Sequence, residues 1–161
     1  MNGIDPRQLL DLVVRPTLLH LDLLSPAAEQ LVLGTAAQES KLCYLKQLGL
    51  GPAVGLWQME PATERDLWEN FLAYKPSLRA KVEALLAPEP SRTQQLATNL
   101  AYGCAMCRVH YLRKPAALPD AADIQGMARY WKLHYNTPLG RGTINEFVRS
   151  WELVAGCWRK Q

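Results

Sequence analysis

Glu39 is the residue of this chain whose type and surroundings are best suited to acid–base chemistry. It follows Val32, Thr35 and Ala36 at the spacing that places side chains on one stripe of an α-helix. A carboxyl group among small and apolar side chains loses water, and its pKa rises. Such a group keeps its proton near neutral pH and can donate it to a leaving oxygen, as cleavage of a glycosidic bond requires. A glutamate near a helix end is more often a solvated surface residue, so the interpretation depends on the rest of the sequence.

Helical periodicity runs through nearly the whole chain and places Glu39 near the end of one helix. Asp5-Pro6 and Ser25-Pro26 each combine an N-cap residue with a proline at the first helical position. The second pair starts a helix that we expect to continue to Ser40. Further helices are expected from Pro61, around residues 78–86, over residues 93–113, from Ile124, and from the capping box Thr143-x-x-Glu146 to Trp158.

The pattern predicts an all-α fold with one domain over residues 1–161. Pro16 should end or kink the first helix, because proline lacks a backbone N–H and its ring clashes with the preceding turn. The glycine cluster lies in residues 46–58, which leaves room for a small β-flap. The tryptophans at core spacing, which we expect to pack inside the domain, are Trp68, Trp131, Trp151 and Trp158.

Composition excludes several classes of protein. The net charge of +3 comes from scattered Lys and Arg, which gives no support to nucleic-acid binding. The N-terminal segment is interrupted by charges, so we predict neither a signal peptide nor a membrane span. Cys104-x-x-Cys107 lacks the second pair of ligands that a zinc site needs, and we expect no metal and no cofactor. The four cysteines are expected to be reduced core residues.

Four segments in a fixed order resemble the lytic transglycosylase and goose-type lysozyme family. The first is the pair Glu39-Ser40, and the second is a glycine-rich run that continues as G-L-x-Q-x-x-P-x-T over Gly55 to Thr63. The third is Asn99-Leu-Ala-Tyr-Gly103, and the fourth is Tyr135-Asn136. Together they cover residues 25–142, with a helical extension at residues 1–24 and a C-terminal helix at residues 143–158. The resemblance implies a lysozyme-like helical domain.

By this resemblance the chain is an enzyme that cleaves the bond between N-acetylmuramic acid and N-acetylglucosamine in peptidoglycan. Glu39 would first protonate the glycosidic oxygen and then take the proton of the muramic C6 hydroxyl, which closes a 1,6-anhydro ring. Residues expected to bind substrate are Ser40, Gly55, Trp57, Gln58, Glu60, Tyr102, Tyr135 and Asn136. Gly55 would let the loop backbone approach the glycan, and Trp57 would stack on a sugar ring.

The sequence departs from the family pattern inside the proposed site. Trp57 stands where the family has Met or Ile, and Glu60 stands where it has an apolar residue. Glu60 leaves open a second carboxylate and therefore simple hydrolysis of the glycan by water. Its alternative role is to cap the helix that Pro61 begins, and we favour the cap.

Short wall-degrading proteins of this kind resemble those that phages build into virions. The expected route is synthesis in the host cytoplasm, association with the virion, and action in the bacterial periplasm and cell wall. Phage tail or other virion proteins are then possible partners. Two alternatives stay open: a structural virion protein that keeps the fold with little activity, and a module that binds glycan without cutting it.

Overall fold

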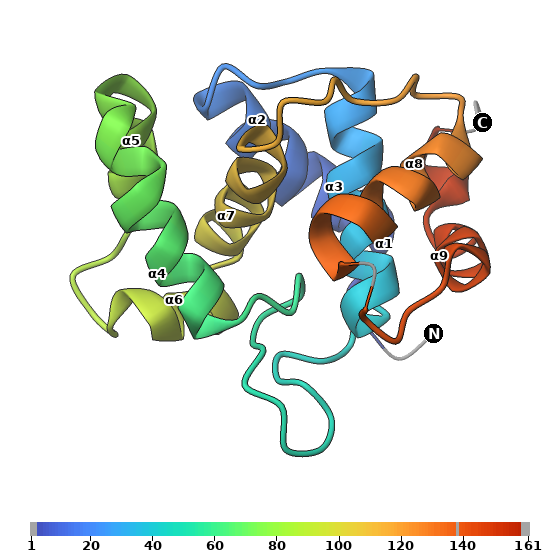
Figure 1. Ribbon diagram of the computed structural model, residues 1–161, viewed down its shortest axis with the longest axis horizontal. Helices are drawn as coiled ribbons and strands as arrows, with labels where there is room; N and C mark the ends of the chain where they lie inside the picture. The colour runs from blue at the N-terminus through green and yellow to red at the C-terminus, as the bar shows by residue number, and fades with distance from the viewer. Residues whose placement is uncertain (1–2, 138, 159–161) are drawn as a thin grey trace.

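The computed structural model describes residues 3–137 and 139–158, and over these residues the chain is all-α, as predicted (Figure 1). The first helical run comprises α1 (Pro6–Leu9), the π-helical turn η1 (Leu10–Val14) and α2 (Arg15–His20). The remaining elements are α3 (Pro26–Ser40), α4 (Pro61–Asn70), η2 (Leu72–Tyr74), α5 (Pro76–Glu83), α6 (Arg92–Thr98), α7 (Leu100–Leu112), α8 (Ile124–Trp131), η3 (Lys132–Asn136), α9 (Ile144–Trp151) and η4 (Ala155–Trp158).

The helix starts expected from the sequence are confirmed. The Asp5 carboxylate accepts from the backbone N–H of Gln8 at 2.9 Å, and the Ser25 hydroxyl caps α3 in the same way. Thr143 and Glu146 form a complete capping box at α9. These side chains satisfy N–H groups that the first turn of a helix leaves without partners.

Pro16 does not end the first helix. The helical run passes through it as α2, and the π-helical turn η1 lies immediately before it. A wider turn at this point accommodates the missing N–H of proline and the bulk of its ring.

The expected helix over residues 93–113 is two helices, and this part of the prediction is wrong. Asn99 has an extended backbone, with φ −121° and ψ 96°, so it ends α6 and caps α7. Its side-chain oxygen accepts from the N–H of Tyr102 at 3.0 Å, and its amide donates to the carbonyl of Leu85 at 2.8 Å. Asn99 therefore turns the chain between two helices that share one hydrophobic periodicity.

Two hydrophobic clusters hold the helices together. One surrounds α3, which packs against α7, α8 and α9, and the other lies under α4, α5, α6 and α7. Trp68, Trp131 and Trp151 are buried in these clusters and Trp158 packs against the first, as expected. The expected core position is confirmed for Cys104, Cys107 and Cys157, which are buried. It is wrong for Cys43, which is exposed.

The segment between α3 and α4 projects from the helices as a long loop (Figure 1). Its only strand-like features in the described part of the chain are isolated bridges that join Lys46 to Val54 and Val54 to Met59. The expected β-flap is therefore an irregular loop held by single bridges. No helix of residues 3–137 and 139–158 is long and apolar enough to cross a membrane.

Candidate active site

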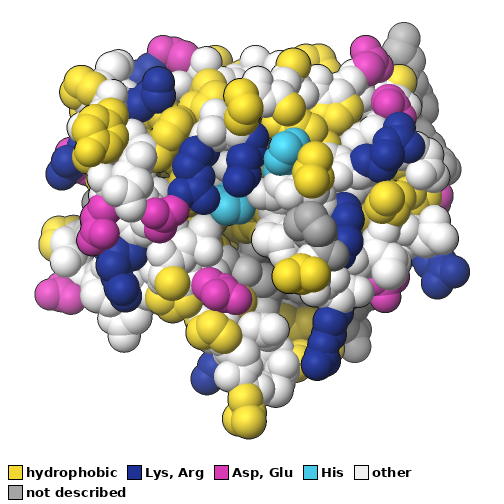
Figure 2. All heavy atoms as spheres, in the orientation of Figure 1, with side chains coloured by type: hydrophobic (Ala, Val, Ile, Leu, Met, Phe, Trp, Pro, Cys, Tyr) yellow, Lys and Arg dark blue, Asp and Glu magenta, His cyan; other side chains and the backbone are white. Residues whose placement is uncertain are grey.

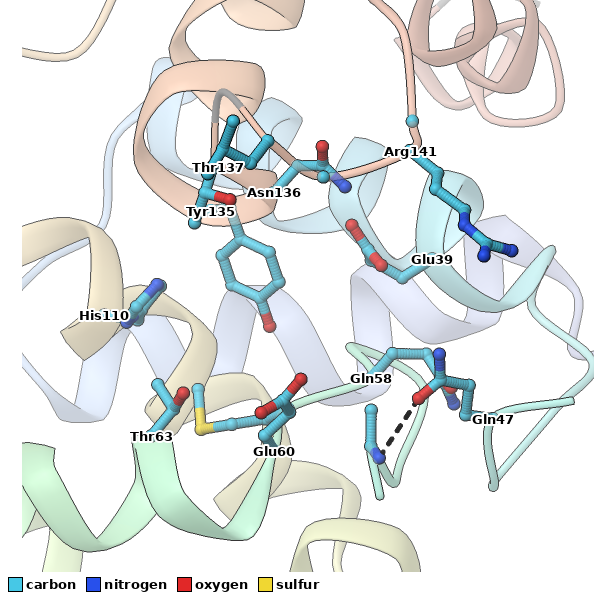
Figure 3. A pocket seen from close by; sticks show the side chains of 15 residues that line it. Glu39, Gln47, Gln58, Glu60, Thr63, His110, Tyr135, Asn136, Thr137 and Arg141 are labelled. Carbon is cyan, nitrogen blue, oxygen red and sulfur yellow. Dashed lines mark hydrogen bonds between the residues drawn. The ribbon is translucent and has the colours of Figure 1, made fainter. Parts of the chain in front are cut away.

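A cleft of about 570 Å³ lies where the end of α3 faces the long loop and η3. Glu39 comes from α3, Gln58 and Glu60 from the loop, and Tyr135 and Asn136 from η3. Figure 3 shows these side chains converging on the cavity from opposite sides. Five of the nine residues that the sequence predicts for the site thus line one cleft.

The Glu39 carboxyl group combines burial with a single hydrogen bond. Its Oε1 accepts from the indole Nε1 of Trp131 at 2.7 Å, and its Oε2 has no hydrogen-bond partner among the described residues. Burial raises the pKa of Glu39 from 4.5 to about 7, while the Trp131 hydrogen bond and the charge of Lys41 act in the opposite direction. Near neutral pH the group therefore exists in both forms, so it can give a proton and take one back.

Lys41 is a cation beside this carboxyl group that the sequence did not single out. It ends α3 in the left-handed conformation, with φ 53°, and its N–H bonds to the carbonyl of Ala37. Its Nζ donates to Ser150 Oγ at 2.6 Å, which ties the end of α3 to α9. Burial lowers the pKa of Lys41, whereas the charges of Glu146 and Glu39 raise it.

Ser40 is not a substrate-binding residue in this structure, which corrects the prediction. Its side chain is 1% exposed, and its hydroxyl donates to the carbonyl of Ala36 at 3.0 Å. The hydroxyl is therefore satisfied by its own helix. Ser40 lies in the last turn of α3, which presents Glu39 to the cleft, and its hydroxyl bonds within that turn instead of reaching the cavity.

Trp57 cannot stack on a sugar ring, because its side chain belongs to the core. The residue is 2% exposed, and its indole N–H donates to the carbonyl of Val32 at 2.9 Å. The hydrogen bond joins the loop to the middle of α3. The prediction of a stacking platform is wrong, and Trp57 instead anchors the wall of the cleft.

Tyr102 lies in the second hydrophobic cluster and does not line the cleft. Its hydroxyl donates to Glu64 Oε1 at 2.6 Å and accepts from Trp68 Nε1 at 2.9 Å. Glu64 also accepts from Arg92 Nε at 2.6 Å. This buried network joins α4, α6 and α7, so Tyr102 has a structural role and not the predicted contact with substrate.

The fold requires a glycine at position 55, where the loop backbone lies against α6. Its φ is +80°, and a Cβ built on it would lie 2.0 Å from the carbonyl oxygen of Leu96. The sequence predicted a close approach to a glycan. In the structure the close approach is to the protein backbone, which corrects that prediction.

Gln58 and Tyr135 line the cleft and also hold the loop. The Gln58 backbone is left-handed, with φ 45°, and its Nε2 donates to the carbonyl of Gly55 at 2.7 Å. Its Oε1 has no partner among the described residues and suits the amide or hydroxyl donors of a sugar. The Tyr135 hydroxyl donates to the carbonyl of Trp57 at 2.6 Å, which connects η3 to the loop.

Asn136 and Glu60 occupy the other two predicted positions in the cleft. Asn136 Oδ1 accepts from Lys132 Nζ at 2.8 Å. Glu60 precedes α4, but its carboxylate accepts no hydrogen bond from that helix, so the capping role that we favoured is wrong. Its side chain is exposed on the cleft wall, which makes it a second carboxylate bordering the same cavity as Glu39.

His110 lines the cleft, although the sequence offered no reason to select it. Burial and the charges of Arg113 and Lys114 lower the pKa of His110 to about 3, so the ring is neutral. Its Nδ1 is buried and has no hydrogen-bond partner among residues 3–137 and 139–158. In the described part of the chain no three His, Cys, Asp or Glu side chains gather as a metal site would require.

Comparison with known proteins adds no assignment: no protein-family model, no curated protein and no solved structure matches the chain.

Proposed function

We propose that this protein cleaves the glycan strands of peptidoglycan as a lytic transglycosylase with a lysozyme-like helical domain. The observation that carries the proposal is the environment of Glu39, a carboxyl group in a cleft with a pKa of about 7. The four-part sequence pattern supplies the substrate class. Gln58, Tyr135 and Asn136, which belong to that pattern, lie around the same cavity.

In the proposed reaction Glu39 acts in both proton transfers, first as the acid and then as the base. Trp131 holds Glu39 Oε1, which leaves Oε2 to protonate the oxygen between N-acetylmuramic acid and N-acetylglucosamine. As that C–O bond breaks, the muramic C6 hydroxyl attacks C1 and gives its proton to the Glu39 carboxylate. The products are a free N-acetylglucosamine hydroxyl and a 1,6-anhydromuramic end, and Glu39 is protonated again. The nucleophile belongs to the substrate, so no second carboxylate is needed.

Hydrolysis is the second candidate, and the exposed carboxylate of Glu60 on the cleft wall favours it. An inverting glycosidase places a general base about 6.5–9.5 Å from its acid, so that a water molecule fits between them. In that reaction Glu60 would activate the water while Glu39 protonates the leaving oxygen. The product would be a reducing muramic end.

The sequence resemblance extends the proposal to a phage wall-degrading protein that is part of the virion. Its partners would then be peptidoglycan strands and neighbouring virion proteins. A structural virion protein or a non-cleaving glycan module would bind the same polymer without turnover, and the experiment below separates these from an enzyme.

The test is digestion of purified peptidoglycan followed by mass spectrometry of the released sugars. We expect 1,6-anhydromuramic ends, which are about 18 Da lighter than hydrolysed ends because no water is added. Glu39→Gln should lose at least about a hundredfold in rate, the usual scale of general acid catalysis. The Gln side chain can still accept from Trp131, so thermal unfolding should show an intact fold. Near-normal cleavage by this variant, or no cleavage by the unmodified chain, would reject the proposal.

A further inference from the structure

Exposed apolar side chains gather on the loop between α3 and α4. Ten large hydrophobic side chains are exposed in the described part of the chain, and four of them lie within residues 44–50: Tyr44, Leu45, Leu48 and Leu50. Leu48 is 69% exposed, and Leu50 is fully exposed. Single exposed leucines are common on protein surfaces, whereas a contiguous apolar group marks a surface that contacts a partner.

Backbone hydrogen bonds hold the base of this loop and leave its end projecting. The N–H of Gln47 donates to the carbonyl of Ala53 at 2.9 Å, and the N–H of Gly55 donates to the carbonyl of Leu45 at 2.9 Å. Beyond these pairs lie residues 48–52, which we call the loop tip. Figure 1 shows the loop extending away from the helices, and Figure 2 shows hydrophobic side chains at its free end. Gln47 and Ala53 line the cleft, so the base of the loop is cleft wall and the tip lies outside it.

The charges of the loop favour a negatively charged partner. Residues 40–59 contain no Asp or Glu, and their two cations are Lys41 and Lys46. The Lys41 ammonium donates to Ser150, which holds it at the end of α3. Lys46 is exposed and takes part in none of the salt bridges among residues 3–137 and 139–158. A positive charge is therefore available beside an apolar tip that carries no acidic group.

The loop orders its side chains as the surface of a bilayer orders its layers. Leu48 and Leu50 belong to the tip, whereas Tyr44 and Lys46 precede it on the side of the base. Leucine prefers the acyl region, and tyrosine and lysine prefer the headgroup level, where their polar ends meet water and lipid phosphate. Binding to such a surface grows with the apolar area buried and with attraction to anionic lipids, and the loop offers both.

We propose that the loop tip inserts Leu48 and Leu50 into the surface of an anionic phospholipid bilayer, with Lys46 at the level of the lipid phosphates. The contact is peripheral and is made by a few side chains. It goes beyond the proposed function and does not depend on it. Because the base of the same loop lines the cleft, this contact holds the cleft close to the membrane surface.

The test is co-sedimentation of the whole chain with lipid vesicles, which gives a partition coefficient for each variant. One set of vesicles contains phosphatidylcholine and phosphatidylglycerol in equal parts, and the other contains phosphatidylcholine alone. The double variant Leu48→Ser/Leu50→Ser removes the apolar tip, and Lys46→Gln removes the charge. All three side chains are exposed, so thermal unfolding of these variants should match that of the parent.

Matched controls carry the same substitutions outside the loop. Leu12→Ser/Leu19→Ser replaces two leucines that are 72% and 61% exposed in the first helical run. Lys75→Gln replaces an exposed lysine that precedes α5. Both controls should bind the vesicles like the parent.

The parent should bind the vesicles that contain phosphatidylglycerol more tightly than those of phosphatidylcholine alone. Leu48→Ser/Leu50→Ser should weaken binding to the former by about tenfold or more, because two leucine side chains no longer gain from leaving water. Lys46→Gln should weaken it by about two- to fivefold, the effect of one lysine near an anionic surface. Binding of Lys46→Gln to phosphatidylcholine alone should equal that of the parent.

Three results would overturn the membrane contact: no binding by the parent, equal binding by the parent and Leu48→Ser/Leu50→Ser, or an equal loss in Leu12→Ser/Leu19→Ser. If the parent binds no vesicles but self-associates in analytical ultracentrifugation, and the tip variant does not, the tip is an interface between copies of the chain. If the parent binds no vesicles and the tip variant loses binding of soluble peptidoglycan fragments, the tip holds glycan instead. None of these results rejects the proposed function, which peptidoglycan digestion tests separately.

Discussion

The indole N–H of Trp131 reaches the carboxyl group of Glu39 across 92 positions of the chain, at 2.7 Å. Trp131 ends α8 and is fully buried, so its ring has no freedom to turn away. Burial raises the pKa of Glu39, and this hydrogen bond is the largest opposing influence. The pair therefore holds one carboxyl oxygen in place and sets the pH at which the other can donate a proton.

Replacing Trp131 by Phe should raise the pKa of Glu39 above about 7, because the donor that stabilises the carboxylate is lost. In the proposed reaction the basic limb of the kcat/KM profile, where Glu39 loses its proton, should move up by about one pH unit. The measurement is a pH–rate profile with soluble glycan fragments. Phe147→Leu is the control, since the Phe147 ring packs on the Trp131 ring at 5.4 Å between centroids, whereas the indole N–H donates to Glu39. That variant should lose stability with no shift of the profile, and a shift in both variants would assign the effect to packing alone.

Folding stability should fall as pH rises through the range in which Glu39 ionises. The folded-state pKa of about 7 exceeds the ordinary value of 4.5, so the folded chain holds this proton more tightly than the unfolded chain. The contribution is complete below pH 4.5 and is lost as pH rises to about 7, with a size on the order of 3 kcal/mol. Denaturant unfolding of Glu39→Gln should lack this component and show a gain over the parent above pH 7. Parallel stability curves for the two proteins would contradict a raised pKa.

Gly55→Ala should destabilise the fold severely, whereas Gly49→Ala should be mild. Both glycines have positive φ, at +80° and +85°, so each alanine carries a backbone cost of about 1–2 kcal/mol. Only the Gly55 Cβ meets the Leu96 carbonyl, at 2.0 Å, while nothing lies within 4 Å of the Gly49 position. Thermal unfolding of the pair measures the difference. Similar losses for both variants would mean that the loop moves away from α6 at little cost.

Helix starts and the place of Glu39 could be predicted from the sequence because their signals are local. Ser25 and Pro26 begin α3, and helical spacing from there puts Glu39 in its last turn. Asn99 escaped prediction because the same apolar periodicity continues on both of its sides. Its preference for the N-cap position was the signal that could have revealed the break.

The environment of the site was harder to predict, because burial and contact partners depend on segments far apart in the chain. The sequence of a motif does not show whether its glycine or tryptophan contacts a ligand or packs in the core. Trp57 and Gly55 proved to pack against α3 and α6, which lie outside the run that contains them. Trp131 had core spacing, but periodicity does not say where an indole N–H points.

Glu60→Gln separates the two proposed reactions. If the muramic C6 hydroxyl is the nucleophile, Glu60 takes no part in proton transfer. The variant should then keep its rate within about three- to fivefold, with anhydro ends as the product. Because the Glu60 carboxylate makes no capping hydrogen bond, the substitution should also leave thermal stability unchanged. Thr143→Ala is the matched control for a real cap, since its hydroxyl accepts from the Glu146 N–H, and it should cost about 1 kcal/mol. Reducing muramic ends together with a loss of about a hundredfold or more in Glu60→Gln would identify Glu60 as the base that activates water. The cleft would then belong to a two-carboxylate hydrolase in which Glu39 is the acid alone.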